Sequence, residues 1–278
     1  MRLSTLYMML TGKSQVKTGT ELTVVTPAST QTTKKCLQPS SESPIMRRPH
    51  HCTVIAMSAS IDTRPTDDNG DDSLFARIAA DIRQKGYSVT PNALPQSLAA
   101  SLFEYLQSLN DEDFCDAGIG RQRDATLNQF VRRDEIRWIE GESDAERYWL
   151  DWMARLQAYL NRHLLLGLFS YESHFAHYQP GDFYRKHLDA FRGSANRRLS
   201  TVAHLNPGWQ PDDGGELVIY YPDKDAEICR VTPAYGTLTV FLSEEFPHEV
   251  LAAGRHRYSI AGWFRVNSSA NARVDPPR

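Results

Sequence analysis

Eight short segments rich in strand-forming residues follow one another between residues 169 and 266. Turns that contain Pro, Gly or Asp separate them, and no stretch between them has the apolar spacing of a helix. An α/β fold is therefore excluded for this region, because parallel strands need a long crossover, usually a helix, between them. The sequence predicts an α+β fold whose core is a double-stranded β-helix, or jelly roll, over about 169–266.

Helices are expected only before these strands, where they would buttress the jelly roll. The first has Asp72 as its N-cap and Gly86 as its stop, and the second has Pro95 in its first turn. The elements expected in this part are helices over 72–86, 94–109 and 144–166 and a strand over 134–141.

The ends of the chain differ in composition from the middle. Residues 1–70 are rich in Ser, Thr, Pro and Lys, which predicts a disordered extension, and Met57 is as good a candidate for the true start as Met1. The expected organisation is a disordered extension over 1–70, a folded domain over 71–268 and a disordered tail over 269–278.

The overall composition argues against two classes of partner. A net charge of −3 gives no basic field for nucleic acid, and no apolar run is long enough to span a membrane. Four cysteines without C-x-x-C spacing favour a reducing compartment over a disulfide framework or a zinc site. We therefore expect a cytoplasmic protein that binds neither nucleic acid nor a membrane.

Three residues have the identity and order of a non-haem iron site. His187 and Asp189 are two apart, so on a strand both side chains reach the same side, and His248 follows 59 residues after Asp189 in the motif FPHEV. Two imidazoles and one carboxylate form the facial triad of Fe(II) oxygenases, which leaves three coordination positions open. The sequence thus predicts His187, Asp189 and His248 as metal ligands.

Arg257 lies nine residues after His248 on an otherwise apolar strand. A buried arginine is costly unless it meets an anion, and a guanidinium can hold a carboxylate with two parallel hydrogen bonds. Beside an Fe(II) site, this predicts a 2-oxoacid that binds iron at one end and Arg257 at the other. The best candidate is 2-oxoglutarate; a salt bridge at the sheet edge is the alternative for Arg257.

From about Ile78 to Val266 the sequence resembles the 2-oxoglutarate-dependent prolyl hydroxylases, in particular the hypoxia-inducible-factor enzymes and their bacterial relatives. The motifs RRDEIRWIEG, YQPGDFYRKHLDAF, GGELVIYYP and FPHEV…RYSIAGWF occur in the family's order. The resemblance implies that residues 71–268 are a dioxygenase domain that hydroxylates a prolyl residue of a protein, as a peptidyl-proline 4-hydroxylase does, with release of succinate and CO2. It implies Fe(II), 2-oxoglutarate and O2 as cofactors, with ascorbate as an optional reductant.

The resemblance also assigns roles to residues around the metal. Tyr178 is implied as a residue near the cosubstrate, and Tyr184 and Trp263 as substrate-side or pocket-wall positions. Either Arg197 or Arg198 corresponds to an arginine that contacts substrate in the family. The bacterial relatives suggest a translation component such as elongation factor Tu as the substrate protein.

Two positions depart from the family's pattern. His204 stands where the family has a tyrosine that helps to bind the 2-oxoglutarate carboxylate, and a histidine can donate the same hydrogen bond. Ala261 stands where the family has a hydroxyl residue, which removes one donor to the cosubstrate. His204 is accordingly a predicted cosubstrate-binding residue.

Two questions stay open from the sequence. The polar segment 110–133 is either a mobile loop that borders the active site or a plain surface loop. The domain is either a prolyl hydroxylase, a small-molecule hydroxylase or a non-catalytic sensor of iron or 2-oxoglutarate. No catalytic acid or base is expected beyond the metal centre, because strand alternation points Glu249 away from the metal.

Overall fold

The computed structural model describes residues 68–117, 130–190 and 196–267, all within one compact unit. The predicted extension, apart from its helical residues 68–70, and the predicted tail lie outside this range. In chain order the elements are α1 (Asp68–Lys85), β1 (Tyr87–Thr90), α2 (Gln96–Ser108), η1 (Asp111–Asp113), β2 (Cys115–Asp116), β3 (Glu135–Trp138), α3 (Asp144–Leu164), β4 (Leu168–Tyr178), β5 (Tyr184–His187), β6 (Arg197–His204), η3 (Pro211–Asp213), β7 (Leu217–Tyr220), β8 (Glu227–Val231), β9 (Leu238–Leu242), β10 (His248–Val250) and β11 (Arg257–Val266).

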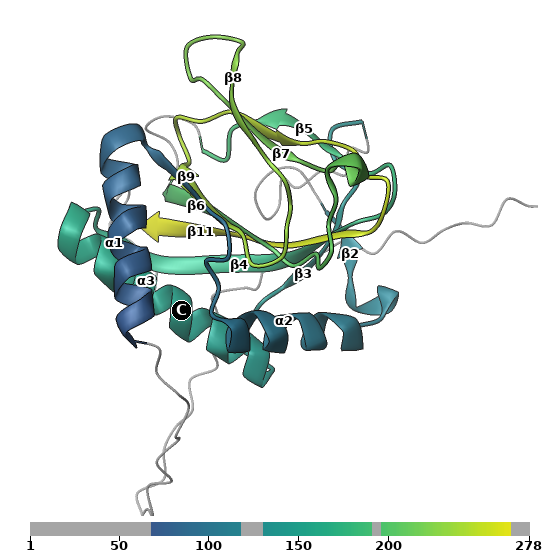
Figure 1. The fold of residues 1–278 in the computed structure, drawn as a ribbon, viewed down its shortest axis with the longest axis horizontal. Coiled ribbons are helices and arrows are strands. Elements are labelled where there is room, and N and C mark those ends of the chain that lie inside the picture. Colours follow the sequence, from purple (N-terminus) through teal and green to yellow (C-terminus); the bar gives the residue numbers. More distant parts are fainter. Residues whose placement is uncertain (1–67, 118–129, 191–195, 268–278) are drawn as a thin grey trace, which may run out of the picture. The chain divides into compact units, whose positions relative to one another are not determined.

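The strands form two antiparallel sheets, a seven-stranded sheet in the order β1-β9-β6-β11-β4-β3-β2 and a four-stranded sheet in the order β5-β10-β7-β8 (Figure 1). All eight segments predicted after residue 169 are strands, and in the described part of the chain no α-helix follows α3. The jelly-roll prediction is confirmed.

The two faces of the seven-stranded sheet have different partners, because side chains alternate along each strand. Phe175, Ile260 and Phe264 point outward and are fully buried in the core shared with α1, α2 and α3. On the inner face, Ala176 of β4 packs with Leu217 of the four-stranded sheet. The helices therefore support one side of the sheet and leave its inner face free to build a site.

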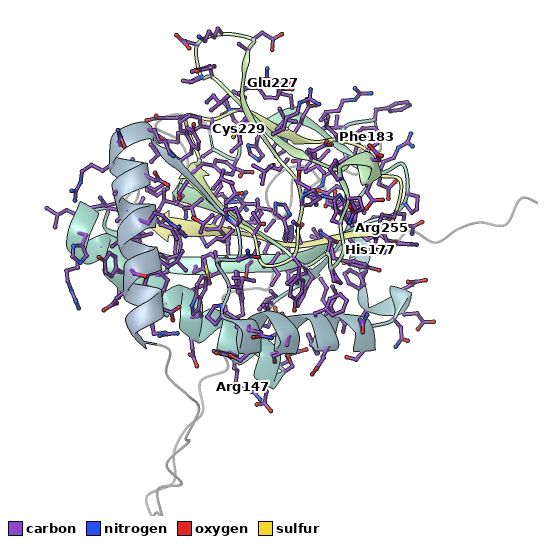
Figure 2. All side chains as sticks on the ribbon, viewed as in Figure 1. Arg147, His177, Phe183, Glu227, Cys229 and Arg255 are labelled. Carbon is purple, nitrogen blue, oxygen red and sulfur yellow. The ribbon has the colours of Figure 1, made fainter. Side chains whose placement is uncertain are left out.

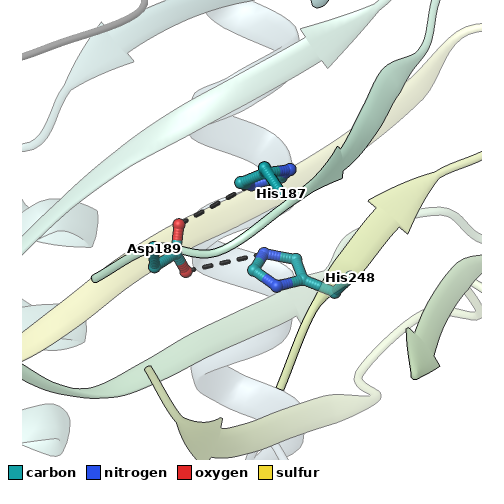
Figure 3. A group of neighbouring side chains, drawn as sticks. All are labelled: His187, Asp189 and His248. Atoms are coloured by element: carbon teal, nitrogen blue, oxygen red, sulfur yellow. Dashed lines mark ion pairs between the residues drawn. The ribbon is translucent and has the colours of Figure 1, made fainter. Parts of the chain in front are cut away.

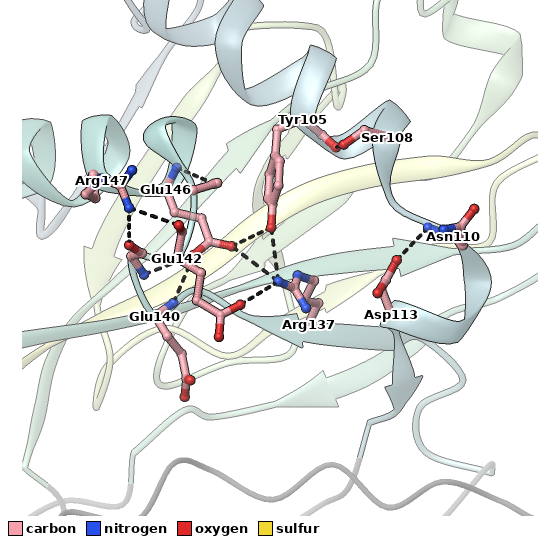
Figure 4. A network of polar contacts seen from close by, with 11 residues as sticks. Tyr105, Ser108, Asn110, Asp113, Arg137, Glu140, Glu142, Glu146 and Arg147 are labelled. Carbon is pink, nitrogen blue, oxygen red and sulfur yellow. Dashed lines mark hydrogen bonds and ion pairs between the residues drawn. The ribbon is translucent and has the colours of Figure 1, made fainter. Parts of the chain in front are cut away.

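A buried carboxylate fixes the turn between β3 and α3. Glu146 is fully buried and accepts hydrogen bonds from the backbone N–H groups of residues 140–142, at 2.8 to 3.3 Å, and from the Tyr105 hydroxyl at 3.0 Å (Figure 4). A charged acceptor with several donors satisfies a turn that would otherwise bury unpaired amides. This network fixes the end of β3, the strand that carries Trp138 to the inner face.

The first helix begins earlier than its apolar pattern indicated. Asp72 is not the N-cap but lies inside α1, which starts at Asp68. The additional turn has no apolar stripe; instead Asp71 accepts a hydrogen bond from Trp152 Nε1 and pairs with Arg155. Such contacts with α3 are tertiary and leave no local signal. The predicted stop at Gly86 is confirmed, with φ of +80°.

The second and third helices and the strand before α3 are slightly shorter than predicted. Pro95 precedes α2 as its N-cap instead of lying in its first turn, and β3 covers residues 135–138 only. α3 ends at Leu164 because Leu165 adopts a left-handed backbone conformation.

No helix in residues 68–117, 130–190 and 196–267 is long and apolar enough to cross a membrane. Cys229 is a free thiol, whereas Cys115 is disulfide-bonded, so the cysteine pattern did not predict the state of Cys115.

Candidate metal centre

The three predicted ligands converge where β5 meets β10. His187 ends β5, Asp189 lies two residues beyond it, and His248 begins β10 directly opposite His187 in the strand pairing. Asp189 Oδ1 lies 3.7 Å from His187 Nε2, and Asp189 Oδ2 lies 3.5 Å from His248 Nε2 (Figure 3). One ligand atom from each residue lies within 4.8 Å of the other two, which suits a single ion.

Backbone contacts set the tautomer of both histidines. His187 Nδ1 lies 2.7 Å from the carbonyl oxygen of Arg185, and His248 Nδ1 lies 3.1 Å from that of Phe246. A carbonyl only accepts, so Nδ1 carries the proton in each ring and donates it. The lone pairs of both Nε2 atoms are therefore free and face Asp189, as metal-binding histidines require.

The charge state of the cluster also suits a metal cation. Burial by itself would raise the pKa of the Asp189 carboxyl. The facing rings of His248 and His187, and the Arg197 guanidinium, lower that pKa by more, to well below its usual value. Burial, followed by the His187 ring, lowers the pKa of His248 to about 4, so this imidazole is neutral at pH 7. A carboxylate beside neutral imidazole is the form that binds a metal.

Two serines that the sequence analysis missed hold the carboxylate. Ser200 on β6 donates to Asp189 Oδ2 at 2.6 Å, since a carboxylate only accepts. Ser243 Oγ lies 2.9 Å from Ser200 Oγ and so donates to it. Both serines are buried. Side chains alternate along β6, so Ser200 lies on the inner face together with Val202 and His204. Its partner Asp189 follows β5 of the other sheet, and no local pattern indicates that contact.

Tyr184 lies directly against the cluster. Its ring centroid is 3.6 Å from that of His187, with the two planes 15° apart, and the Arg132 guanidinium lies 4.4 Å from its centroid. Arg132 in turn donates to the buried carboxylate of Asp134 at 2.7 Å. This end of the predicted 110–133 loop thus contacts the strand that carries His187, while residues 118–129 lie outside the described range.

Arg257 is a buried cation of the inner face, with 1% of its surface exposed. Nε donates to the Gly215 carbonyl at 2.8 Å and Nη1 to Ser259 Oγ at 3.2 Å, whereas Nη2 meets no acceptor in the described part of the chain. The ring of Tyr178 lies 4.9 Å from the guanidinium. No carboxylate in the described residues pairs with Arg257, so the salt bridge that was its alternative is not formed there.

The unpaired polar atoms near Arg257 belong to neighbouring strands. His204 is fully buried, and neither ring nitrogen has a partner. Burial, and next the charge of Arg257, hold the pKa of His204 well below its usual value. The Thr239 hydroxyl, on the next strand, is also buried without a partner. Unpaired buried polar groups are costly, so this patch fits an anionic ligand with several acceptor oxygens.

The structure separates the two candidate arginines. Arg197 lies 3.6 Å above the Trp263 ring, donates to Glu172 at 3.0 Å and lowers the pKa of Asp189. Arg198 instead lines a cavity on the helical side, together with Ile82 and Arg83. Arg197 therefore lies on the metal side of β6 and Arg198 on the helical side.

Two other positions singled out in the sequence are Ala261 and Glu249. Ala261 contributes its backbone carbonyl, which accepts from His174 Nδ1 at 3.2 Å, and Ser259 supplies a hydroxyl two positions earlier on the same strand. Glu249 accepts a hydrogen bond from the Tyr220 hydroxyl. This contact agrees with the prediction that Glu249 points away from the metal.

Comparison with known proteins agrees with this geometry. A family profile described as the 2OG-Fe(II) oxygenase superfamily matches residues 173–265. A crystal structure of a Pseudomonas putida prolyl-4-hydroxylase is 40% identical, with a TM-score of 0.62, and the match covers 69% of this chain and 98% of that one. The chain belongs to the 2OG-Fe(II) oxygenase superfamily. Membership implies Fe(II), 2-oxoglutarate and O2 as the reaction partners of this oxygenase.

Two other relatives extend the comparison. Human Egl nine homolog 1 is 26% identical over 204 residues, which are 69% of this chain and 47% of that protein. The oxygenase spans about half the length of the curated relatives it matches. The fold is also that of a Trichoplax adhaerens prolyl hydroxylase in complex with a hypoxia-inducible-factor peptide, with a TM-score of 0.63, 24% identity and coverage of 73% and 94% of the two chains.

Proposed function

We propose that this oxygenase hydroxylates a prolyl residue of a protein substrate, with His187, Asp189 and His248 as its iron ligands. The observation that carries the proposal is the arrangement of the inner face, where the His-Asp-His cluster shares one jelly roll with the unpaired Nη2 of Arg257. The 40% identity to a bacterial prolyl-4-hydroxylase supports the choice of substrate class.

In this proposal the chain positions its ligands, and the metal supplies the oxidation. Bound iron would activate O2 and couple the oxidation of 2-oxoglutarate to succinate and CO2 with hydroxylation of the substrate. Ser200 holds the Asp189 carboxylate, and the two backbone carbonyls hold the imidazoles in the tautomer that presents Nε2. The protein thus builds its ligand geometry before the metal binds.

The cosubstrate side is formed by Arg257, His204 and Tyr178. Arg257 Nη2 has the charge and the free N–H groups to bind the distal carboxylate of 2-oxoglutarate. His204 adds a ring nitrogen close to the same guanidinium, and the pKa of the Tyr178 hydroxyl is raised by burial, so this side chain stays neutral. The assignment of 2-oxoglutarate to this patch rests on these unpaired donors.

The substrate side is proposed to include Tyr184, Arg197 and Trp263. Tyr184 covers the His187 imidazole, and Arg197, which lies over the Trp263 ring, acts on the Asp189 carboxylate through its charge. The resemblance to bacterial enzymes extends the proposal to a translation component such as elongation factor Tu as substrate, in the cytoplasm, with ascorbate as a reductant.

The direct test is turnover of 2-oxoglutarate by Fe(II)-loaded protein with proline-containing peptides. Succinate formation that peptide stimulates, together with a peptide mass gain of one oxygen atom, is the expected result. Asp189→Ala should remove both signals and metal binding. Stimulation by small molecules only would indicate the small-molecule hydroxylase, and the absence of any succinate would indicate a sensor.

The substrate itself can be found by intact-protein mass spectrometry of lysates from a strain that lacks this gene. The expected result is one protein that lacks the mass of one oxygen atom relative to the parent strain. Complementation with the wild-type gene should restore that mass, whereas complementation with Asp189→Ala should not. Unchanged elongation factor Tu would exclude that substrate and leave the enzyme class to the peptide assay.

A further inference from the structure

His174 lies on the inner face of β4, between two tryptophans. Its ring centroid is 5.1 Å from that of Trp138 on β3 and 5.5 Å from that of Trp263 on β11. Only 3% of the residue is exposed. Trp263 lies under Arg197 and pairs with Ser200, which donates to the Asp189 carboxylate, so His174 lies near the metal cluster. The charges of Arg132, Arg197 and Asp189 act on its imidazole. None of the roles described above uses this histidine.

The hydrogen bond of His174 determines which of its ring nitrogens can accept a hydrogen bond from a ligand. Nδ1 lies 3.2 Å from the Ala261 carbonyl oxygen and must donate to it. Burial, and next the charges of Arg132 and Arg197, lower the pKa of His174 to about 3. The ring is therefore neutral at pH 7, and among the described residues no donor reaches the lone pair of Nε2. His174 thus offers an acceptor beside the two indole rings.

The two tryptophans supply hydrogen-bond donors beside this acceptor. Trp138 Nε1 and Trp263 Nε1 are buried N–H donors that meet no acceptor among the described residues. Two unpaired buried donors and one acceptor without a donor, next to each other, match a group that offers both carbonyl oxygen and N–H. A peptide backbone is such a group. A small apolar molecule or a simple anion would leave at least one of these atoms unpaired.

We propose that Trp138, His174 and Trp263 form a peptide-binding box beside the metal. His174 Nε2 accepts a hydrogen bond from a substrate backbone N–H that flanks the target proline, and the indole N–H groups donate to substrate carbonyls. This inference rests on the proposed prolyl hydroxylase function and specifies how the substrate is held. His174 is a substrate-positioning residue in this arrangement, because it contacts the substrate backbone and not the reacting carbon.

The test starts from a set of acetylated, amidated nonapeptides with a central proline. The peptide that wild-type protein hydroxylates fastest is used in all further measurements. Analogues of this peptide replace one flanking backbone N–H at a time by an ester oxygen. In wild-type protein one of these esters should raise KM roughly tenfold, because the N–H that His174 accepts is gone. In His174→Leu, KM for the amide peptide should rise roughly tenfold, and that ester should then change KM less than twofold.

Two further variants keep the test independent of folding. His174→Gln retains an acceptor and should give a KM between those of wild type and His174→Leu. His177→Gln is the matched control: His177, labelled in Figure 2, lies three residues after His174 on the same strand, so its side chain is on the opposite face. There it contacts His256. This control should show the full ester effect. The KM for 2-oxoglutarate should change far less than the KM for the peptide in both His174 variants.

Different results would overturn the peptide-binding box and the prolyl hydroxylase function on which it rests. An equal ester effect in wild type, His174→Gln and His174→Leu, or no ester effect at all, overturns the box while peptide hydroxylation stands. If wild-type protein forms succinate but hydroxylates no proline peptide, the prolyl hydroxylase proposal fails, and the box fails with it.

Discussion

The Ser200 hydroxyl offers the sharpest test of how the site is built. It donates to Asp189 Oδ2 at 2.6 Å and receives a hydrogen bond from Ser243. In Ser200→Ala the Asp189 carboxylate loses this hydrogen bond, so its oxygens are no longer held toward the Nε2 atoms of His187 and His248. A metal ion would then have to order the carboxylate as it binds, so we expect weaker metal binding.

The size of the effect follows from the bond that is lost. A hydrogen bond to a charged acceptor contributes about 1.5–3 kcal/mol. Removing a partner that orients a metal ligand typically lowers metal affinity by about 10- to 100-fold, or roughly 1.4–2.7 kcal/mol. The two ranges overlap, so Ser200→Ala should bind Fe(II) about 10- to 100-fold more weakly than wild type.

Anaerobic Fe(II) titration in competition with a chelator measures this affinity directly. Ser243→Ala is the matched control, because it disturbs the same buried pair but leaves the Ser200–Asp189 bond in place. Its affinity should lie much closer to wild type. Fe(II) affinity within threefold of wild type in Ser200→Ala, or an equal loss in Ser243→Ala, would refute the role given to Ser200.

The other predictions concern the cosubstrate, the pH response and the packing. Arg257→Lys should raise KM for 2-oxoglutarate by about 10- to 100-fold, because it removes two-pronged carboxylate binding, with Fe(II) affinity little changed; equal losses of both would contradict this. The depressed pKa values of His174 and His248, about 3 and about 4, mean that only the unfolded chain takes up these protons as pH falls below 6.5. The metal-free protein should therefore lose about 2 kcal/mol per histidine between pH 7 and pH 5 in urea unfolding; a flat profile would count against neutral buried rings. Gly262→Ala should cost about 1–3 kcal/mol in the same assay, since a Cβ there would lie 2.3 Å from the Tyr171 hydroxyl.

The sequence by itself determined the strands and the three residues of the candidate metal centre. Strand alternation and turn residues are local signals, and they sufficed for all eight segments after residue 169. The His187, Asp189 and His248 set was also recognisable, because few residue combinations suit an open iron site and the order of the motifs restricted the choice. Where local signals are weak, as in the first turn of α1, the prediction was wrong.

Only the tertiary structure decided what surrounds those ligands. Ser200 reaches Asp189, and Trp138 reaches His174, because strands far apart in the chain are brought together by the pairing of the sheet and by the facing of the two sheets. The choice between Arg197 and its neighbour was likewise a matter of which face of β6 each occupies. Such contacts depend on long-range register, and a single sequence carries no local record of it.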